Sequence, residues 1–130
     1  MKFTRRYILV CAVFVCYSGC SSSDITSPGD VVFPARGVSF RSHVEPLFTI
    51  SCNVQGCHDA ARPDNYQVDL TSWVGTRATN VVNQPGDTNC GLIRVVLERQ
   101  LHRGYFGVPG LTENNRQGLK QWVIEGAQNN

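Results

Sequence analysis

The chain has 130 residues, a length that allows one domain at most. It carries 12 Lys and Arg residues against 10 Asp and Glu residues. Three of the basic residues lie within the first six positions, and all acidic residues follow Cys20. The part after Cys20 therefore has nine basic and ten acidic side chains, a net charge of −1. Its arginines are scattered rather than clustered, which excludes a basic stripe for binding nucleic acid.

The N-terminal segment has the pattern of an export signal. Lys2, Arg5 and Arg6 precede ILVCAVFVCYSG, an apolar run of about a dozen residues that is too short to span a bilayer comfortably. Small residues then lead into Cys20, an order that resembles a bacterial lipoprotein signal, in which the cysteine becomes lipidated after cleavage. An ordinary signal peptide or a transmembrane anchor is the alternative. We expect a signal peptide over residues 1–19, a lipid on Cys20, and a location in the bacterial cell envelope, on the periplasmic or outer-membrane face.

A polar segment follows the signal. Residues 20–37 are rich in Ser, Asp, Pro and Gly, and we expect them to form a flexible tether that buries no core. The folded domain is then expected over residues 38–130. A domain of this size is marginal on its own apolar burial, so a large, covalently held cofactor would supply core that the chain lacks.

The first predicted helix covers residues 43–51. Ser42 and Glu45 have the spacing of a capping box, and Pro46 falls in the first turn, where a missing N–H costs little. One face of this helix would carry Val44, Leu47, Phe48 and Ser51. The helix would deliver Cys52 at its C-terminal end.

Two more helices are predicted downstream. One covers residues 89–103, where five apolar side chains lie close to helical spacing: Leu92, Ile93, Val96, Leu97 and Leu101. The other begins at Thr112, a good N-cap residue, and has Gly126 near its end. Its apolar face carries Leu119, Trp122, Val123 and Ala127. The only strand candidate, at residues 66–70, is short, so the domain is predicted to be mainly α.

Three cysteines remain after the signal, namely Cys52, Cys57 and Cys90, in a compartment where disulfides persist. His58 follows Cys57 directly, as in a c-type haem motif, where two thiols bond the porphyrin and the histidine reaches the iron. Four residues separate Cys52 from Cys57, in place of the common two. Cys90 would be left over, unless it forms a disulfide with Cys52 or Cys57. A zinc site of the three cysteines and His58 is a third alternative, although ligands on adjacent residues strain tetrahedral geometry.

Four stretches carry a resemblance to a known family: VSFRSHVEPLFTISCNVQGCHDA, VDLTSW, VVNQPGDTNCGLIRVVL and LTENNRQGLKQWVIEGAQNN. In this order they are similar to the motifs of small c-type cytochrome modules of the planctomycete-type cytochrome c family. They cover nearly all of residues 38–130. The resemblance implies a cytochrome c-like domain of about three to four helices around a haem c. It also implies covalent attachment of the haem to Cys52 and Cys57, with His58 as the proximal iron ligand.

The family usually places a Met-Pro pair before the last helix, and that methionine is the second axial ligand. This chain has Val108 there, and its only methionine is Met1. His102, six residues upstream of Val108, is the best candidate for a distal ligand, and His43 is a second one. Cys90 stands where the family often has serine.

The expected function is that of a membrane-anchored electron carrier, which is not an enzyme and has no small-molecule substrate. It would pass single electrons through the haem to a redox protein partner, bind the membrane through the lipid on Cys20, and bind no nucleic acid. Iron held by two histidines would have a lower potential than iron held by His and Met, whereas an open sixth site would bind CO. The alternative is a haem-free structural or adaptor lipoprotein in which Cys90 is bridged to Cys52 or Cys57.

Overall fold

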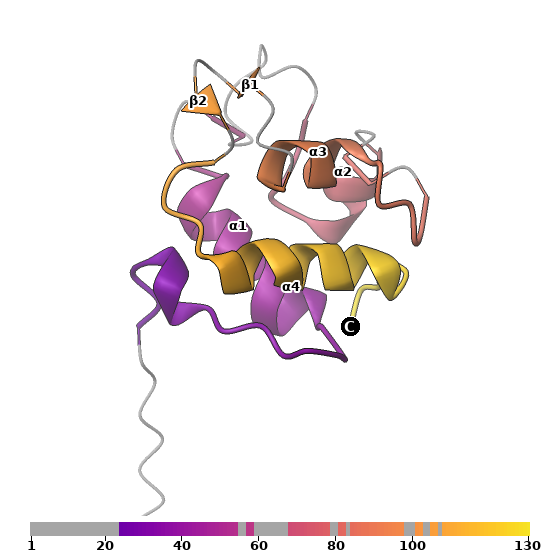
Figure 1. The fold of residues 1–130 in the computed structure, drawn as a ribbon, viewed down its shortest axis with the longest axis horizontal. Helices are drawn as coiled ribbons and strands as arrows, with labels where there is room; N and C mark the ends of the chain where they lie inside the picture. The colour runs from indigo at the N-terminus through magenta and orange to yellow at the C-terminus, as the bar shows by residue number, and fades with distance from the viewer. Residues whose placement is uncertain are drawn as a thin grey trace, which may run out of the picture.

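The computed structural model describes residues 24–54, 57–58, 68–78, 81–82, 84–97, 101–102, 105–106 and 108–130. The elements in these ranges are the 3-10 turn η1 (Pro28–Asp30), the π-helical turn η2 (Phe40–Val44), the helices α1 (Glu45–Ser51), α2 (Trp73–Ala78), α3 (Gly91–Val96) and α4 (Glu113–Ile124), and the two-residue strands β1 (Leu101–His102) and β2 (Tyr105–Phe106) (Figure 1). The strands pair antiparallel, with Leu101 opposite Phe106. The prediction of a mainly α domain is confirmed for this part of the chain. None of the helices described combines the length and the hydropathy needed to span a bilayer.

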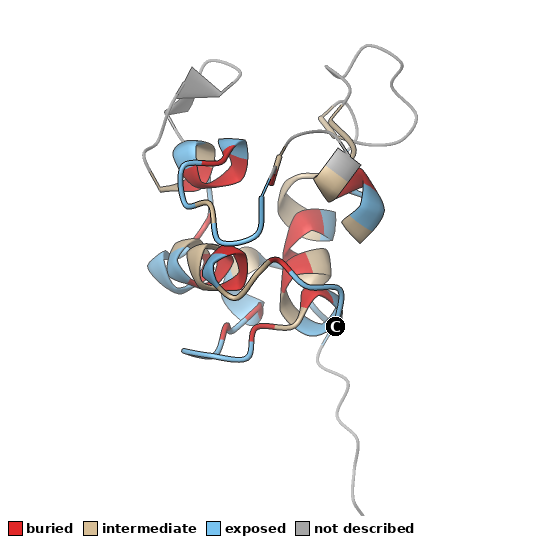
Figure 2. Ribbon diagram, turned by 90° about the vertical axis from the view of Figure 1, so that its right-hand side faces the viewer, coloured by how far each residue is buried: buried red, intermediate tan, exposed pale blue. Residues whose placement is uncertain are grey.

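Helix α4 is the centre of the core. It crosses the front of the molecule in Figure 1, with α1 and η2 behind it and α3 packed against it. Trp122 is fully buried, and its ring centroid lies 5.7 Å from that of Phe40 in η2. Buried residues gather on the sides of the helices that face one another (Figure 2). The other large, fully buried apolar side chains are Val38, Val44, Leu47, Phe48, Val82, Leu119 and Val123.

Both ends of α4 agree with the predictions. The Thr112 hydroxyl accepts a hydrogen bond from the Asn115 N–H, and the Asn115 side chain accepts one from the Thr112 N–H, which closes a capping box. At the other end Gly126 has φ +99°, a value that glycine adopts at little cost. The N–H groups of Gly126 and Ala127 then bond carbonyls of the last turn.

The first predicted helix begins earlier than expected. The residue that caps its first turn is Ser39, whose hydroxyl accepts a hydrogen bond from the Ser42 N–H at 3.1 Å, so Ser42 is not the N-cap. The chain then forms the π-helical turn η2 before α1 continues it to Ser51. The capping box predicted for Ser42 and Glu45 is therefore wrong, because the helical run begins at Phe40, before Ser42. Asn130, at the C-terminus, accepts hydrogen bonds from the Ser39 hydroxyl and the Phe40 N–H, and these bonds hold the start of the run in place.

The second predicted helix is shorter than expected. Helix α3 ends at Val96, and Leu101, which we expected on its apolar face, lies in β1 instead. The Val96 carbonyl accepts a hydrogen bond from the guanidinium of Arg116 in α4, which satisfies an acceptor at the helix end. Residues 68–70 of the strand candidate are not in a strand, and the rest of it lies outside the described residues.

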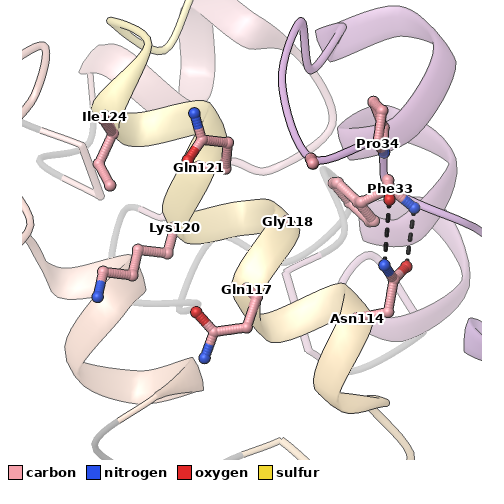
Figure 3. A pocket seen from close by; sticks show the side chains of 9 residues that line it. Phe33, Pro34, Asn114, Gln117, Gly118, Lys120, Gln121 and Ile124 are labelled. Carbon is pink, nitrogen blue, oxygen red and sulfur yellow. Dashed lines mark hydrogen bonds between the residues drawn. The ribbon is translucent and has the colours of Figure 1, made fainter.

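The N-terminal segment is packed rather than free. Val31 and Phe33 belong to the core, with 4 % exposure each, so the prediction that residues up to 37 bury no core is wrong for them. The Asn114 side-chain amide bonds both the N–H and the C=O of Phe33, as Figure 3 shows. The Asn115 amide donates to the Val31 carbonyl at 2.8 Å. Composition alone could not reveal these partners, because they lie some 80 residues away.

Residues that follow α4 accept hydrogen bonds from the later part of the same segment. The Glu125 carboxylate accepts hydrogen bonds from the N–H groups of Gly37 at 2.9 Å and Val38 at 2.8 Å. Asn130 accepts from the Phe40 N–H, the Arg41 N–H and the Ser39 hydroxyl. Residues 31–41 therefore run along α4, from Asn114 in its first turn to the tail beyond its end, and this attachment sets where η2 and α1 begin.

We expect Gly118→Ala to destabilise the protein by about 1–3 kcal/mol, although alanine favours helix over glycine. A Cβ at this position in α4 would lie 2.1 Å from Cγ of Phe33. Urea unfolding measures the change. In a Phe33→Ala background the same substitution should cost little or become stabilising, and Gln117→Ala, at an exposed neighbour, should have almost no effect. Equal effects of Gly118→Ala in both backgrounds would contradict the contact.

We expect the stability of the protein to fall below pH 4.5 through Glu125. Its pKa lies below the usual 4.5, chiefly because the Gln121 amide donates a hydrogen bond to the carboxylate, and also because the Val38 and Gly37 N–H groups do so. A lowered pKa in the folded state stabilises that state above the unfolded pKa, and this contribution is lost as the pH falls through the folded pKa. Urea midpoints of wild type and Glu125→Gln should therefore differ at pH 6 and converge toward pH 3.

Glu113→Gln is the matched control for that experiment. Glu113 lies in the first turn of α4, and its carboxylate accepts a hydrogen bond from the Gln117 side chain but from none of the backbone groups described for residues 31–41. A loss of stability for Glu113→Gln as large as that for Glu125→Gln at pH 6 would show that the Gly37 and Val38 contacts are not the cause.

Candidate functional site

The end of α1 positions the first cysteine of the motif. The N–H groups of Cys52 and Asn53 both donate to the Phe48 carbonyl at 2.8 Å, so the chain leaves the helix in a tight turn. The Asn53 side-chain amide donates to the Leu70 carbonyl at 2.8 Å. Cys52 is therefore held from two sides, by the helix before it and by the segment that leads to α2.

The loop between the cysteines returns to its starting point. The Cys57 N–H donates to the Val54 carbonyl at 2.9 Å, and the His58 N–H donates to the Cys52 carbonyl at 3.1 Å. Residues 55–56 lie outside the described residues. The structure thus brings the backbones of Cys52, Cys57 and His58 together at one end of α1.

Cys52, Cys57 and Cys90 are all free thiols. Cys52 and Cys57 are half-buried, whereas Cys90 is buried at the N-cap of α3. Burial raises the pKa of Cys52 to about 12, with a smaller contribution from the nearby Cys57, and burial also raises the pKa of Cys90. Within the described ranges, which include these three cysteines and His58, no three His, Cys, Asp or Glu side chains form a metal-binding group. Neither the zinc alternative nor the disulfide to Cys90 gains support from this geometry.

The two candidate distal histidines differ in what the structure describes. His43 packs against Phe33 with ring centroids 5.7 Å apart, and its Nδ1 accepts from the Ser39 N–H at 3.0 Å. It lies at the start of the helical run that ends at Cys52, about 13 Å away along the axis. His102 pairs in β1 with Tyr105, but its side chain is outside what the structure describes, so its role stays a prediction. The same holds for lipidation of Cys20, which precedes the described residues.

Val108, which stands where the sixth ligand was expected, is held by an arginine that the sequence did not single out. Its carbonyl accepts from Nη2 of Arg116 at 3.2 Å, and the same nitrogen lies 3.4 Å from the Leu111 carbonyl. Arg116 also bonds the Val96 carbonyl at the end of α3. One side chain of α4 thus fixes both the end of α3 and the 108–111 loop. No local sequence pattern predicts these hydrogen bonds of Arg116, because the acceptors are backbone carbonyls from separate parts of the chain.

The residues of the motif fit a haem c. Covalent attachment needs two thiols that are not in disulfides and an adjacent imidazole, and Cys52, Cys57 and His58 supply them in one place. The porphyrin also needs apolar surface, and several hydrophobic side chains pack against the core while staying partly exposed: Ile50, Val68, Trp73, Val81, Leu97 and Val108. Among the described residues, the buried Oγ of Ser51 and Oδ1 of Asn53, on either side of Cys52, have no hydrogen-bond partner. Buried polar atoms of this kind are rare without a ligand or water nearby.

Comparison of the chain with protein-family models, with curated proteins and with solved structures found no match. The resemblance to planctomycete-type cytochromes therefore stays a prediction made from the sequence motifs. The chemistry of the site rests on Cys52, Cys57 and His58 themselves.

In the haem-free protein we expect iodoacetamide to modify Cys52 at pH 8 about a thousand times more slowly than it modifies the same thiol in urea. Only the thiolate attacks, and a pKa of about 12 leaves almost none of it in the folded state. Peptide mass mapping over time gives the rate at Cys52. Similar rates in the folded and the unfolded chain would mean that the turn after α1 does not bury this thiol.

Proposed function

We propose that the protein is a lipid-anchored c-type cytochrome domain that carries single electrons. The observation that supports this best is the hydrogen bond from the His58 N–H to the Cys52 carbonyl at 3.1 Å. It closes the loop that carries two free thiols and His58 at the end of α1, in a domain whose core leaves several apolar side chains only partly covered. This combination suits covalent haem attachment better than a tetrahedral metal site or a disulfide.

Each residue of the motif has a distinct role in this proposal. The Cys52 and Cys57 thiols would each add across one vinyl group of the haem, with sulfur bonding one vinyl carbon and the thiol hydrogen passing to the other. His58 would be the proximal ligand of the iron. The bound haem supplies one-electron redox chemistry, and the chain itself needs no catalytic group for outer-sphere transfer.

The chain contributes a fixed, largely apolar surround. The Asn53 amide holds the loop after Cys52 to the Leu70 carbonyl, and Arg116 holds the 108–111 loop to α4. A valine at position 108 cannot coordinate iron, so His102 is the residue of this chain proposed for the sixth position. The proposed partner in electron exchange is a redox protein, since an electron carrier of this kind needs no small-molecule substrate.

Expression of the full chain with a haem-attachment system tests the proposal. We expect a pyridine haemochrome spectrum with covalently bound haem, and the loss of one thioether bond in Cys52→Ala or Cys57→Ala, which shifts the haemochrome band. Cys90→Ala is the matched control, because this thiol is buried at the start of α3 and is not needed for attachment. A chain that takes up no covalent haem would overturn the proposal. The proposal would also be overturned if Cys90→Ala lost the haem while Cys52→Ala and Cys57→Ala kept it.

A further inference from the structure

Arg77 in α2 has a buried nitrogen for which the described part of the chain offers no acceptor. Its Nη1 is shielded from solvent and makes no hydrogen bond with any described residue. A guanidinium carries a full positive charge, and taking one of its N–H groups out of water without an acceptor is unfavourable. Such donors are rare in native proteins and call for a bound group that supplies the acceptor.

The carboxylate nearest to Arg77 along the chain is already engaged. Asp69 accepts hydrogen bonds at Oδ1 from the N–H and the hydroxyl of Thr71, at 2.8 and 2.6 Å. Its Oδ2 lies against Gly75, since a Cβ at this glycine would be 2.1 Å from that oxygen. Asp69 is therefore bound near the start of α2, whereas Arg77 lies in the last turn of the helix.

The burial pattern of α2 places Arg77 on its inner side. Val74 is 65 % exposed, whereas Thr76 is fully buried and Trp73 and Arg77 are half-buried. Trp73 and Arg77 are four residues apart, so they are neighbours on the helix surface. The Trp73 ring packs against the core, and its Nε1 donates to the Ala127 carbonyl at 2.7 Å. This side of α2 thus presents a fixed, partly covered aromatic ring beside a cation.

The segment that leads into α2 is held against the cysteine motif. The Leu70 carbonyl, three residues before the helix, accepts from the Asn53 side chain at 2.8 Å. Arg77 therefore lies at most about 17 Å from this contact. Two other buried polar atoms without a described partner, Ser51 Oγ and Asn53 Oδ1, flank Cys52. Buried polar atoms that lack a partner thus occur on both sides of the contact between the motif and α2.

We infer that Arg77 binds a propionate carboxylate of the haem. The inference rests on the proposed function, which makes a haem attached at Cys52 and Cys57 the ligand beside α2. Haem combines a planar apolar ring with two carboxylates, and α2 offers the Trp73 ring beside an unpaired cationic nitrogen. A guanidinium and a carboxylate form charge-assisted hydrogen bonds, which are stronger than those between neutral groups. The haem would thereby have a noncovalent attachment in addition to its thioether bonds.

Iron mesoporphyrin IX tests the inference in the full chain produced without haem. Ethyl groups replace the vinyl groups in this porphyrin, so it forms no thioether bonds and its affinity measures noncovalent contacts alone. Its dimethyl ester lacks the negative charge of both propionates. In absorbance titrations in the same detergent, we expect the wild-type chain to bind the free acid about tenfold more tightly than the ester.

Variants of Arg77 assign this preference to one side chain. Arg77→Gln should remove it, whereas Arg77→Lys should retain part of it, because lysine keeps the charge but not the planar set of donors. Arg94→Gln, at an exposed position of α3, is the matched control and should keep the full preference.

The outcomes separate the role of Arg77 from the proposed function. Equal affinities of the wild-type chain for the acid and the ester would overturn the role of Arg77 and leave the electron carrier standing. An unchanged preference in Arg77→Gln would do the same. A wild-type chain that binds neither porphyrin would overturn the haem site, and the role of Arg77 with it.

The stability of the haem-free chain gives a second measurement. Arg77→Met keeps most of the length of the side chain but removes the guanidinium. Because Nη1 has no described acceptor in the haem-free chain, the urea midpoint of this variant should equal or exceed that of the wild type. A lower midpoint would show that a residue of the chain itself already accepts from Arg77, and would overturn the assignment to a propionate.

Discussion

The fold depends on hydrogen bonds from side chains of α4 and the C-terminal tail to the backbone of residues 31–41. An extended segment that joins no sheet must find other partners for its N–H and C=O groups when it is buried. Asn114, Asn115, Glu125 and Asn130 provide them, at distances of 2.8 to 3.1 Å. The two ends of the domain are thereby joined. Each such bond contributes about 1 kcal/mol, so the set is substantial for a domain whose apolar burial is marginal.

This attachment decides where the candidate site residues lie. Asn130 and Ser39 fix the start of η2, and the run through η2 and α1 then places Cys52 at a set distance from it. The same contacts press Phe33 against Gly118, which explains a glycine in the interior of a helix where alanine would otherwise be preferred. A change in the docked segment would therefore move α1 as a unit, together with the turn that carries the motif.

The sequence predicts the features that depend on neighbouring residues. The N-cap at Thr112, the helix end at Gly126 and the apolar face of α4 are local, and all three are confirmed. The grouping of Cys52, Cys57 and His58 is local too. The errors arise where a distant partner decides the outcome. Arg116 bonds the Val96 carbonyl where the predicted helix would have continued, and the asparagines of α4 bind a segment whose composition is typical of a free tether. Neither helical periodicity nor composition identifies such distant hydrogen-bond partners.

In the proposed function the 108–111 loop would form the second side of the haem site, and the same distant contacts would hold both sides in one frame. The motif side is carried by α1, whereas the 108–111 loop is tied by Arg116 to α4 and to the end of α3. Helix α4 and η2 are packed together through Trp122 and Phe40. A cofactor bound between the motif and that loop would therefore rest on elements that cannot shift independently. Electron transfer favours such a surround, since fixed dipoles need little reorganisation when the charge of the cofactor changes. Arg116 and Glu125 would thus matter for the proposed function through the elements that they hold in place.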